Sequence, residues 1–236
     1  MTFVLATSSR LARACRGWGL GALEFRIGHW ALGIGWAAAL VVPTPLHAQQ
    51  PASPQAIYDT AVDDYREGRV AESAAGFDRL AALVPSEAPQ LWQRGIALYA
   101  AGRYQDCRRQ FESHLTVNPN DVENAAWHFL CVARAESPAR AREALLPVGP
   151  DARVPMRQVY EMFRGRITPD AVIAAAGASL SGRFYAELYV GLYLEAMGNP
   201  RVALEHMAKA ADDRYASVGG YMHMVARMQL RGLRGR

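Results

Sequence analysis

A repeat of 34 residues is the feature that most limits the folds open to this chain. When the sequence is shifted by 34 positions, residues of the same kind coincide: small residues, aromatic residues, a glycine-arginine pair and a proline. The matched pairs are Ala61 and Gly95, Tyr65 and Tyr99, Gly68-Arg69 and Gly102-Arg103, Phe77 and Phe111, and Pro85 and Pro119. Repeats of this length are supersecondary units that bury their apolar faces by stacking on one another. The period therefore predicts a stack of similar helix pairs.

Each matched position has a physical role in such a pair. A small residue such as Gly95 lets the first helix approach its partner closely. Gly102 is expected to end that helix in a left-handed conformation that other residues resist. Phe111 is expected to fill the gap between the paired helices, and Pro119 to prevent the second helix from continuing. The same roles are predicted for the partners of these residues one repeat earlier.

Residue types at this spacing resemble those of the tetratricopeptide repeat (TPR). The resemblance implies an all-α fold, a TPR-type α-solenoid of antiparallel helix pairs. Residues 49–55 form a tether, 56–146 hold two regular repeats and one degenerate repeat, and 147–182 form an irregular helical insert. Residues 183–236 form the final TPR-like repeat and a C-terminal capping helix. The degenerate middle reflects the loss of the glycine-arginine turn after the second repeat.

Capping and turn residues predict the bounds of the later helices. Asp121 should cap a helix over residues 122–135, and Ser137-Pro138 should start a partner helix that reaches Leu146. Further helices are expected over 156–163, from Thr168-Pro-Asp170 onward, and over 217–230, with a linker at 177–182.

The first 48 residues resemble a secretory signal peptide that is cleaved after Ala48. Four arginines precede an apolar run from Trp30 to Val42, and a small-residue end follows it. This run is shorter than the roughly 20 residues that cross a bilayer. We therefore expect an exported protein, in the periplasm or cell envelope. The alternative is an uncleaved leader that acts as an interfacial anchor.

The basic character of the chain belongs mostly to this leader. The formal net charge is +4, and four arginines against one glutamate in residues 1–48 account for three of those charges. The remainder is almost neutral, which gives no support for nucleic acid as a partner. A membrane contact is expected only through an uncleaved leader.

The chain also resembles the NlpI-like family of exported bacterial TPR proteins. The residues behind this resemblance are Arg94-Gly-Ile-Ala-Leu-Tyr99, Gly102-Arg103, Asn118-Pro-Asn-Asp121, Val159-Tyr160 to Gly165, and Phe184-Tyr185 with Leu192-Tyr193 ahead of Gly198. The resemblance implies a non-catalytic scaffold or adaptor that gathers cell-envelope enzymes. The chain departs from the family because Cys15 lacks the sequence context of a lipidation cysteine.

A protein-binding groove is predicted on the concave side, which the first helix of each pair lines. The candidates are aromatic and arginine residues, which offer large contact area and planar hydrogen bonding. They are Tyr58, Tyr65, Arg66, Trp92, Tyr99, Arg134 and Tyr185. The competing interpretation is that Tyr65 and Tyr99 only pack between neighbouring repeats.

The one metal-like set of side chains is Cys107, His114, His128 and Cys131. Two histidines and two cysteines could complete a zinc tetrahedron and serve a metal-dependent hydrolytic enzyme. Their spacing matches no zinc motif, so buried packing is the favoured interpretation and no metal or other cofactor is expected. A Cys107–Cys131 disulfide is the less favoured alternative that an oxidising compartment permits.

No nucleophilic motif accompanies these residues, since the chain contains no Gly-x-Ser-x-Gly. We therefore expect no enzyme, and a protein or peptide partner of unknown identity. A homodimer formed through the apolar helix at 217–230 is the alternative within the same architecture.

Overall fold

The computed structural model describes residues 53–235, and the predicted leader lies outside them. The described part is all-helical, with eleven α-helices, two short 3-10 helices and no strand. The α-helices are α1 (Pro54–Glu67), α2 (Val70–Leu83), α3 (Trp92–Ala100), α4 (Tyr104–His114), α5 (Val122–Ala135), α6 (Pro138–Glu143), α7 (Met156–Phe163), α8 (Pro169–Ala175), α9 (Leu180–Ala196), α10 (Pro200–Ala210) and α11 (Ala216–Arg234).

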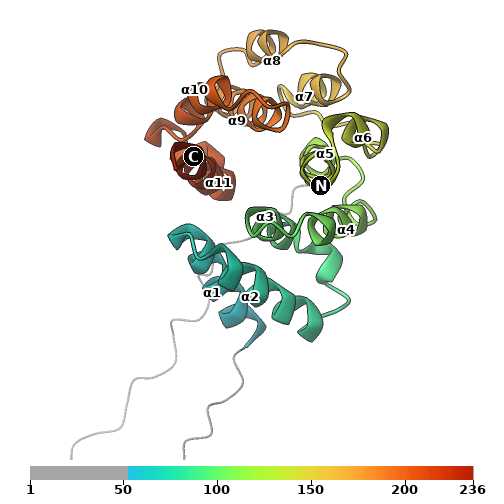
Figure 1. Ribbon diagram of the computed structural model, residues 1–236. Coiled ribbons are helices and arrows are strands. Elements are labelled where there is room, and N and C mark those ends of the chain that lie inside the picture. Colours follow the sequence, from blue (N-terminus) through green and yellow to red (C-terminus); the bar gives the residue numbers. More distant parts are fainter. Residues whose placement is uncertain (1–52, 236) are drawn as a thin grey trace, which may run out of the picture. The chain divides into compact units, whose positions relative to one another are not determined.

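Most helices that follow one another in the sequence pack together, although α7 packs mainly on α5 and α8, and the pairs trace an arc from α1 to α10 (Figure 1). Helix α11 then turns back against α9 and α10, and its Tyr221 reaches across to the first pairs. The Tyr221 ring stacks on Tyr65 of α1 at 6.1 Å and meets the edge of Trp92 of α3 at 5.0 Å. The C-terminal helix therefore contacts the beginning of the arc as well as its end.

The repeat residues take the positions that the sequence predicts for them. Gly68 and Gly102 end α1 and α3 with φ of 87° and 75°, in the left-handed region. Phe77 and Phe111 are buried in the core. A Cβ on Gly95 would lie 2.6 Å from the Phe111 ring, so only glycine permits this approach of α3 to α4. The predicted role of each of these residues in the helix pair is confirmed.

Three predicted helix starts are also confirmed by their caps. Asp121 accepts the Glu123 amide at 3.0 Å ahead of α5. Ser137 and Thr168 accept amide hydrogens at the starts of α6 and α8. Each cap satisfies one of the amides that the first turn of a helix leaves unpaired.

Other bounds differ from the predictions for local reasons. Helix α6 ends at Glu143 rather than Leu146. Leu146 directly precedes Pro147, and the helical conformation is disfavoured for such a residue, so the helix does not reach the predicted end. Residues 180–182, predicted as linker, belong to α9, since Ser179 accepts the Gly182 amide at 3.0 Å and so starts the helix early. Helix α11 extends to Arg234, with a non-helical residue at Gly220.

Within residues 53–235, no helix combines the length and the apolar character needed to cross a membrane.

Candidate functional site

One cavity lies where helices α3, α4, α5, α9 and α11 meet, and we call it the inner pocket. It has a volume of about 280 Å³. Helices α3, α4, α5, α9 and α11 all contribute to its wall, as does the loop before α5. The lining residues are Trp92, Phe111, His114, Asn118, Asp121, Glu123, Asn124, Trp127, Tyr185, Gly219, Tyr221 and Met222.

Five of the twelve lining residues are phenylalanine, tyrosine or tryptophan, and their rings pack on one another or on neighbouring rings. Phe111 and Trp127 stack at 6.3 Å across the α4–α5 contact. Trp92 and Tyr221 meet edge to face, and Tyr185 stacks on Tyr189 along α9 at 6.4 Å. Such pairs are stabilising beyond the area that they bury. The wall is therefore a packed aromatic surface contributed by segments far apart in sequence.

Two polar side chains in the wall have no hydrogen-bond partner among the described residues. Asn124 is 2% exposed, and both its Oδ1 and its Nδ2 are unpaired. Trp127 is equally buried, and its Nε1 is unpaired. A buried polar group without a partner costs about 1–3 kcal/mol. Each of these three atoms exposes less than 1 Å² to solvent, so they are unpaired inside the packed wall rather than open to the cavity.

A cluster of charged groups flanks the pocket at the start of α5. Arg153 donates to Asp121 at 2.6 Å, to Glu123 at 2.5 Å and to Asp151 at 2.6 Å. Tyr189 donates its hydroxyl to the other oxygen of Glu123 at 2.5 Å. Three carboxylates thus share one guanidinium, so the cluster carries a surplus of negative charge when all are ionised.

Burial and this shared arginine set the ionisation of the cluster. Burial raises the pKa of Glu123 to about 7, and the charge of Asp121 acts in the same direction, while Arg153 and Tyr189 oppose it. Burial also acts to raise the pKa of Asp151, but hydrogen bonds from Arg153 outweigh it and that pKa is lowered. Glu123 is therefore the acid whose charge is least favourable in the fold.

The seven predicted groove residues do not form one surface. Trp92 and Tyr185 line the inner pocket. Tyr65 is 0% exposed against Tyr221, and Tyr99 is 7% exposed against Trp127 and Tyr104, so neither offers area to a partner in this conformation.

The remaining three groove candidates lie outside the pocket wall. Tyr58 accepts a hydrogen bond from Gln93 at 2.9 Å. Arg66 is exposed and pairs with Asp63. Arg134 lies over the Tyr104 ring, 5.5 Å from its centroid.

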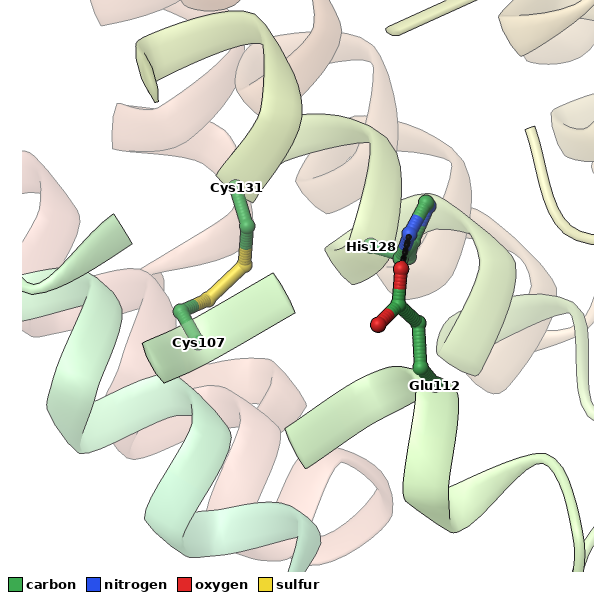
Figure 2. Close-up of a disulfide and its surroundings, with 4 residues drawn as sticks. All are labelled: Cys107, Glu112, His128 and Cys131. Atoms are coloured by element: carbon green, nitrogen blue, oxygen red, sulfur yellow. Dashed lines mark hydrogen bonds and ion pairs between the residues drawn. A yellow bond between two sulfur atoms is a disulfide. The ribbon is translucent and has the colours of Figure 1, made fainter. Parts of the chain in front are cut away.

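The predicted metal-like set does not converge, because its members have separate partners. Cys107 of α4 and Cys131 of α5 form a disulfide, which Figure 2 shows beside a second contact between the same helices, His128 to Glu112 at 3.4 Å. His114 instead contacts the Pro89 carbonyl at 2.8 Å. No group of three metal-ligating side chains occurs in residues 53–235. The four side chains therefore do not gather at one point, and the preference for free buried thiols is wrong, because Cys107 and Cys131 are bridged.

The sequence analysis missed Asn124, Glu123 and Tyr221 as site residues. Asn124 carried a usable signal, since it is the single amide side chain in α5 and directly precedes the apolar run Ala125-Ala126-Trp127. Glu123 and Tyr221 carried none, because a first-turn acid and a tyrosine on an amphipathic helix are common. Only the return of α11 brings Tyr221 to this wall.

No family model matches the chain, and no curated protein matches it at a significant level.

Proposed function

We propose that this protein is an exported, non-catalytic α-solenoid of the TPR type that binds a protein or peptide partner through its inner helices. The observation that carries the proposal is the inner pocket, because one aromatic side chain from each of five helices lines it, beside the polar side chains of Asn118, Asp121 and Glu123. Aromatic area combined with a few oriented polar groups is typical of recognition sites.

The assignment to the TPR type is supported by the pairwise packing and by the 34-residue equivalents. Gly68 and Gly102 take the same left-handed conformation at the same turn of successive pairs. Phe77 and Phe111 are buried in the second helix of each pair. These equivalences favour two copies of one unit over two unrelated hairpins.

Export is supported by the leader and by the Cys107–Cys131 disulfide. Disulfides persist in oxidising compartments and are rare in reducing ones. N-terminal sequencing of the mature protein checks this part of the proposal, with a start near Gln49 as the expected result. A mature form that begins at residue 1 would remove the signal peptide from the account.

Site-directed photo-crosslinking in the native envelope tests the binding function. A benzophenone amino acid at Trp92 or Tyr185, both in the pocket wall, should capture a polypeptide partner. The same group at Leu83, which is 53% exposed at the end of α2, is the matched control outside the pocket. Equal capture from Leu83, or none from either pocket position, would count against binding through the inner helices.

A further inference from the structure

A second cavity lies between the first helix and the last, and we call it the α1–α11 cleft. It has a volume of about 670 Å³, more than twice that of the inner pocket. Val62 and Arg66 of α1 line one side of it, and residues of α11 between Ala216 and Arg231 line the other. Tyr221 lines both cavities, so the cleft and the inner pocket are neighbours.

Part of the cleft's lining is apolar and only half-buried. Val62, Tyr221, Met224 and Met228 all pack against the core, yet each keeps some of its surface exposed. Met224 and Met228 are four residues apart on α11, so they lie on the same face of the helix. Methionine side chains are unbranched and polarizable, which lets them adapt to the shape of a partner. The cleft therefore offers an adaptable apolar surface.

The formally charged side chains that line the cleft are all arginines, and all are exposed. They are Arg66 of α1 and Arg227 and Arg231 of α11. Arg66 pairs with Asp63, and Arg227 pairs with Asp213. All four side chains in these two pairs are more than half exposed, and surface pairs of this kind hold their partners weakly.

Arg231 is the arginine most open to a new partner. It has no carboxylate partner within residues 53–235. A Cβ on Gly68 would lie 3.3 Å from its Nη1 and 3.6 Å from the Met228 Cε, so both side chains reach the end of α1. The partial negative charge at a helix C-terminus attracts the guanidinium and holds it there. Its full charge and several of its five N–H donors remain for a carboxylate.

From this geometry we infer that the α1–α11 cleft binds a short segment of a partner protein that carries large apolar and acidic side chains together. A simple anion would pair with the arginines but leave the methionines exposed, and a purely apolar ligand would leave the arginines without a carboxylate. From Tyr221 to Arg231, α11 rises by about 15 Å, which matches about three turns of a bound helix. The inference goes beyond the proposed function, because it adds a second surface outside the inner pocket.

Calorimetric titration of the full chain with capped peptides tests the inference. The reference peptide carries leucines at helical spacing, glutamates beside them and alanine elsewhere. Three others replace every glutamate by glutamine, every glutamate by lysine, or every leucine by alanine. The glutamate peptide should bind about tenfold more tightly than the glutamine peptide, and the lysine peptide most weakly. The peptide without leucines should bind at least about tenfold more weakly than the reference.

Ionic strength gives an independent measure of the charge contribution. Salt screens attraction between exposed charges. The preference for glutamate over glutamine should therefore shrink as salt is added, while the affinity of the glutamine peptide should not fall. A preference that is the same at low and high salt would contradict pairing between the arginines and the glutamates.

Two variants separate the charged and apolar contributions. Arg231→Gln should weaken the glutamate peptide about two- to fivefold and leave the glutamine peptide unchanged. It breaks no ion pair within residues 53–235, so the fold should be retained. Met224→Gln should weaken both peptides alike. Arg157→Gln on α7 is the matched control, since Arg157 is also exposed, lies outside the cleft and should change nothing. Circular dichroism checks that each variant is folded.

Each outcome supports or overturns the inference. Equal binding of the glutamate and glutamine peptides, or no effect of Arg231→Gln, refutes the acidic character of the partner. Equal binding without the leucines refutes its apolar character. Binding to phosphatidylglycerol vesicles but to none of the peptides refutes a polypeptide as the occupant. Photo-crosslinking from Trp92 and Tyr185 reports on the inner pocket separately, so the proposed function can survive a failure at the cleft.

Discussion

The Cys107–Cys131 disulfide should contribute more to stability than any other single contact between α4 and α5. Both cysteines are fully buried and lie 24 residues apart in sequence. In the chain-entropy account, closing a loop of this length restricts the unfolded state by about 3.4 kcal/mol at 25 °C. If the free energy of unfolding falls by about 2 kcal/mol per molar urea, reduction should lower the unfolding midpoint by about 1.7 M.

The disulfide should also affect the inner pocket, because it links two helices that line it. Phe111 and His114 lie on α4, and Asn124 and Trp127 lie on α5, so the disulfide fixes the angle between two walls of the cavity. Reduction should therefore weaken peptide binding as well as lower the free energy of unfolding.

Urea unfolding followed by circular dichroism, with and without reductant, measures the effect. The double variant Cys107→Ala/Cys131→Ala is the control and should be insensitive to reductant. Thiol counting in denaturant gives an independent check, because the chain after the predicted cleavage site contains only Cys107 and Cys131 and should titrate no free thiol when oxidised. Oxidised and reduced protein with the same midpoint, or two free thiols in the exported protein, would refute the reasoning.

Three further changes have expected outcomes that equilibrium unfolding can check. Gly95→Ala should cost about 1–3 kcal/mol, because the new methyl group overlaps the Phe111 ring; an unchanged midpoint would mean that α3 and α4 are not this close. Gly102→Ala should cost about 1–2 kcal/mol through its φ of 75° alone, since its Cβ would meet nothing within 4 Å, whereas Gly232→Ala, in the helical interior of α11, should not destabilise. Glu123→Gln should remove one source of pH dependence from the free energy of unfolding. The raised pKa of Glu123 means that the folded state binds its proton more tightly than the unfolded state does. The stabilisation from this proton therefore falls as pH rises from about 4.5 to about 7. The unfolding midpoint of the wild type relative to that of Glu123→Gln should fall over the same pH range. Asp121, Asp151, Arg153 and Tyr189 are the same in both proteins. A difference in midpoint that does not change with pH would show that burial does not perturb this acid.

The helices could be predicted wherever a local signal specifies them. Asp121, Ser137 and Thr168 start helices through hydrogen bonds to amides two or three residues away, which are visible in sequence. The linker assigned to residues 177–182 was wrong for 180–182, because four glycine and serine positions suggested a loop, while the Ser179 cap starts α9 inside it.

The candidate site could be predicted only in part. Trp92 and Tyr185 were identified because they lie on the expected inner helices, and both line the inner pocket. Tyr65 and Tyr99 have the same character in sequence but are buried against Tyr221 and Trp127. Helical periodicity gives the face on which a residue lies, but whether that face meets solvent depends on which helix returns to cover it.

The amino-acid sequence by itself determined the helical units of this protein. Helix caps and left-handed glycines act within a few residues, and the 34-residue period repeats the glycine turns from one unit to the next. Only the tertiary structure decided that α11 turns back to α1 and α3, that Cys107 meets Cys131, and that Arg153 is shared among three carboxylates. Apart from the pairing of Arg153 with Asp151, these contacts join residues 24 or more positions apart. Their geometry depends on the summed angles between successive helix pairs, which no single segment specifies.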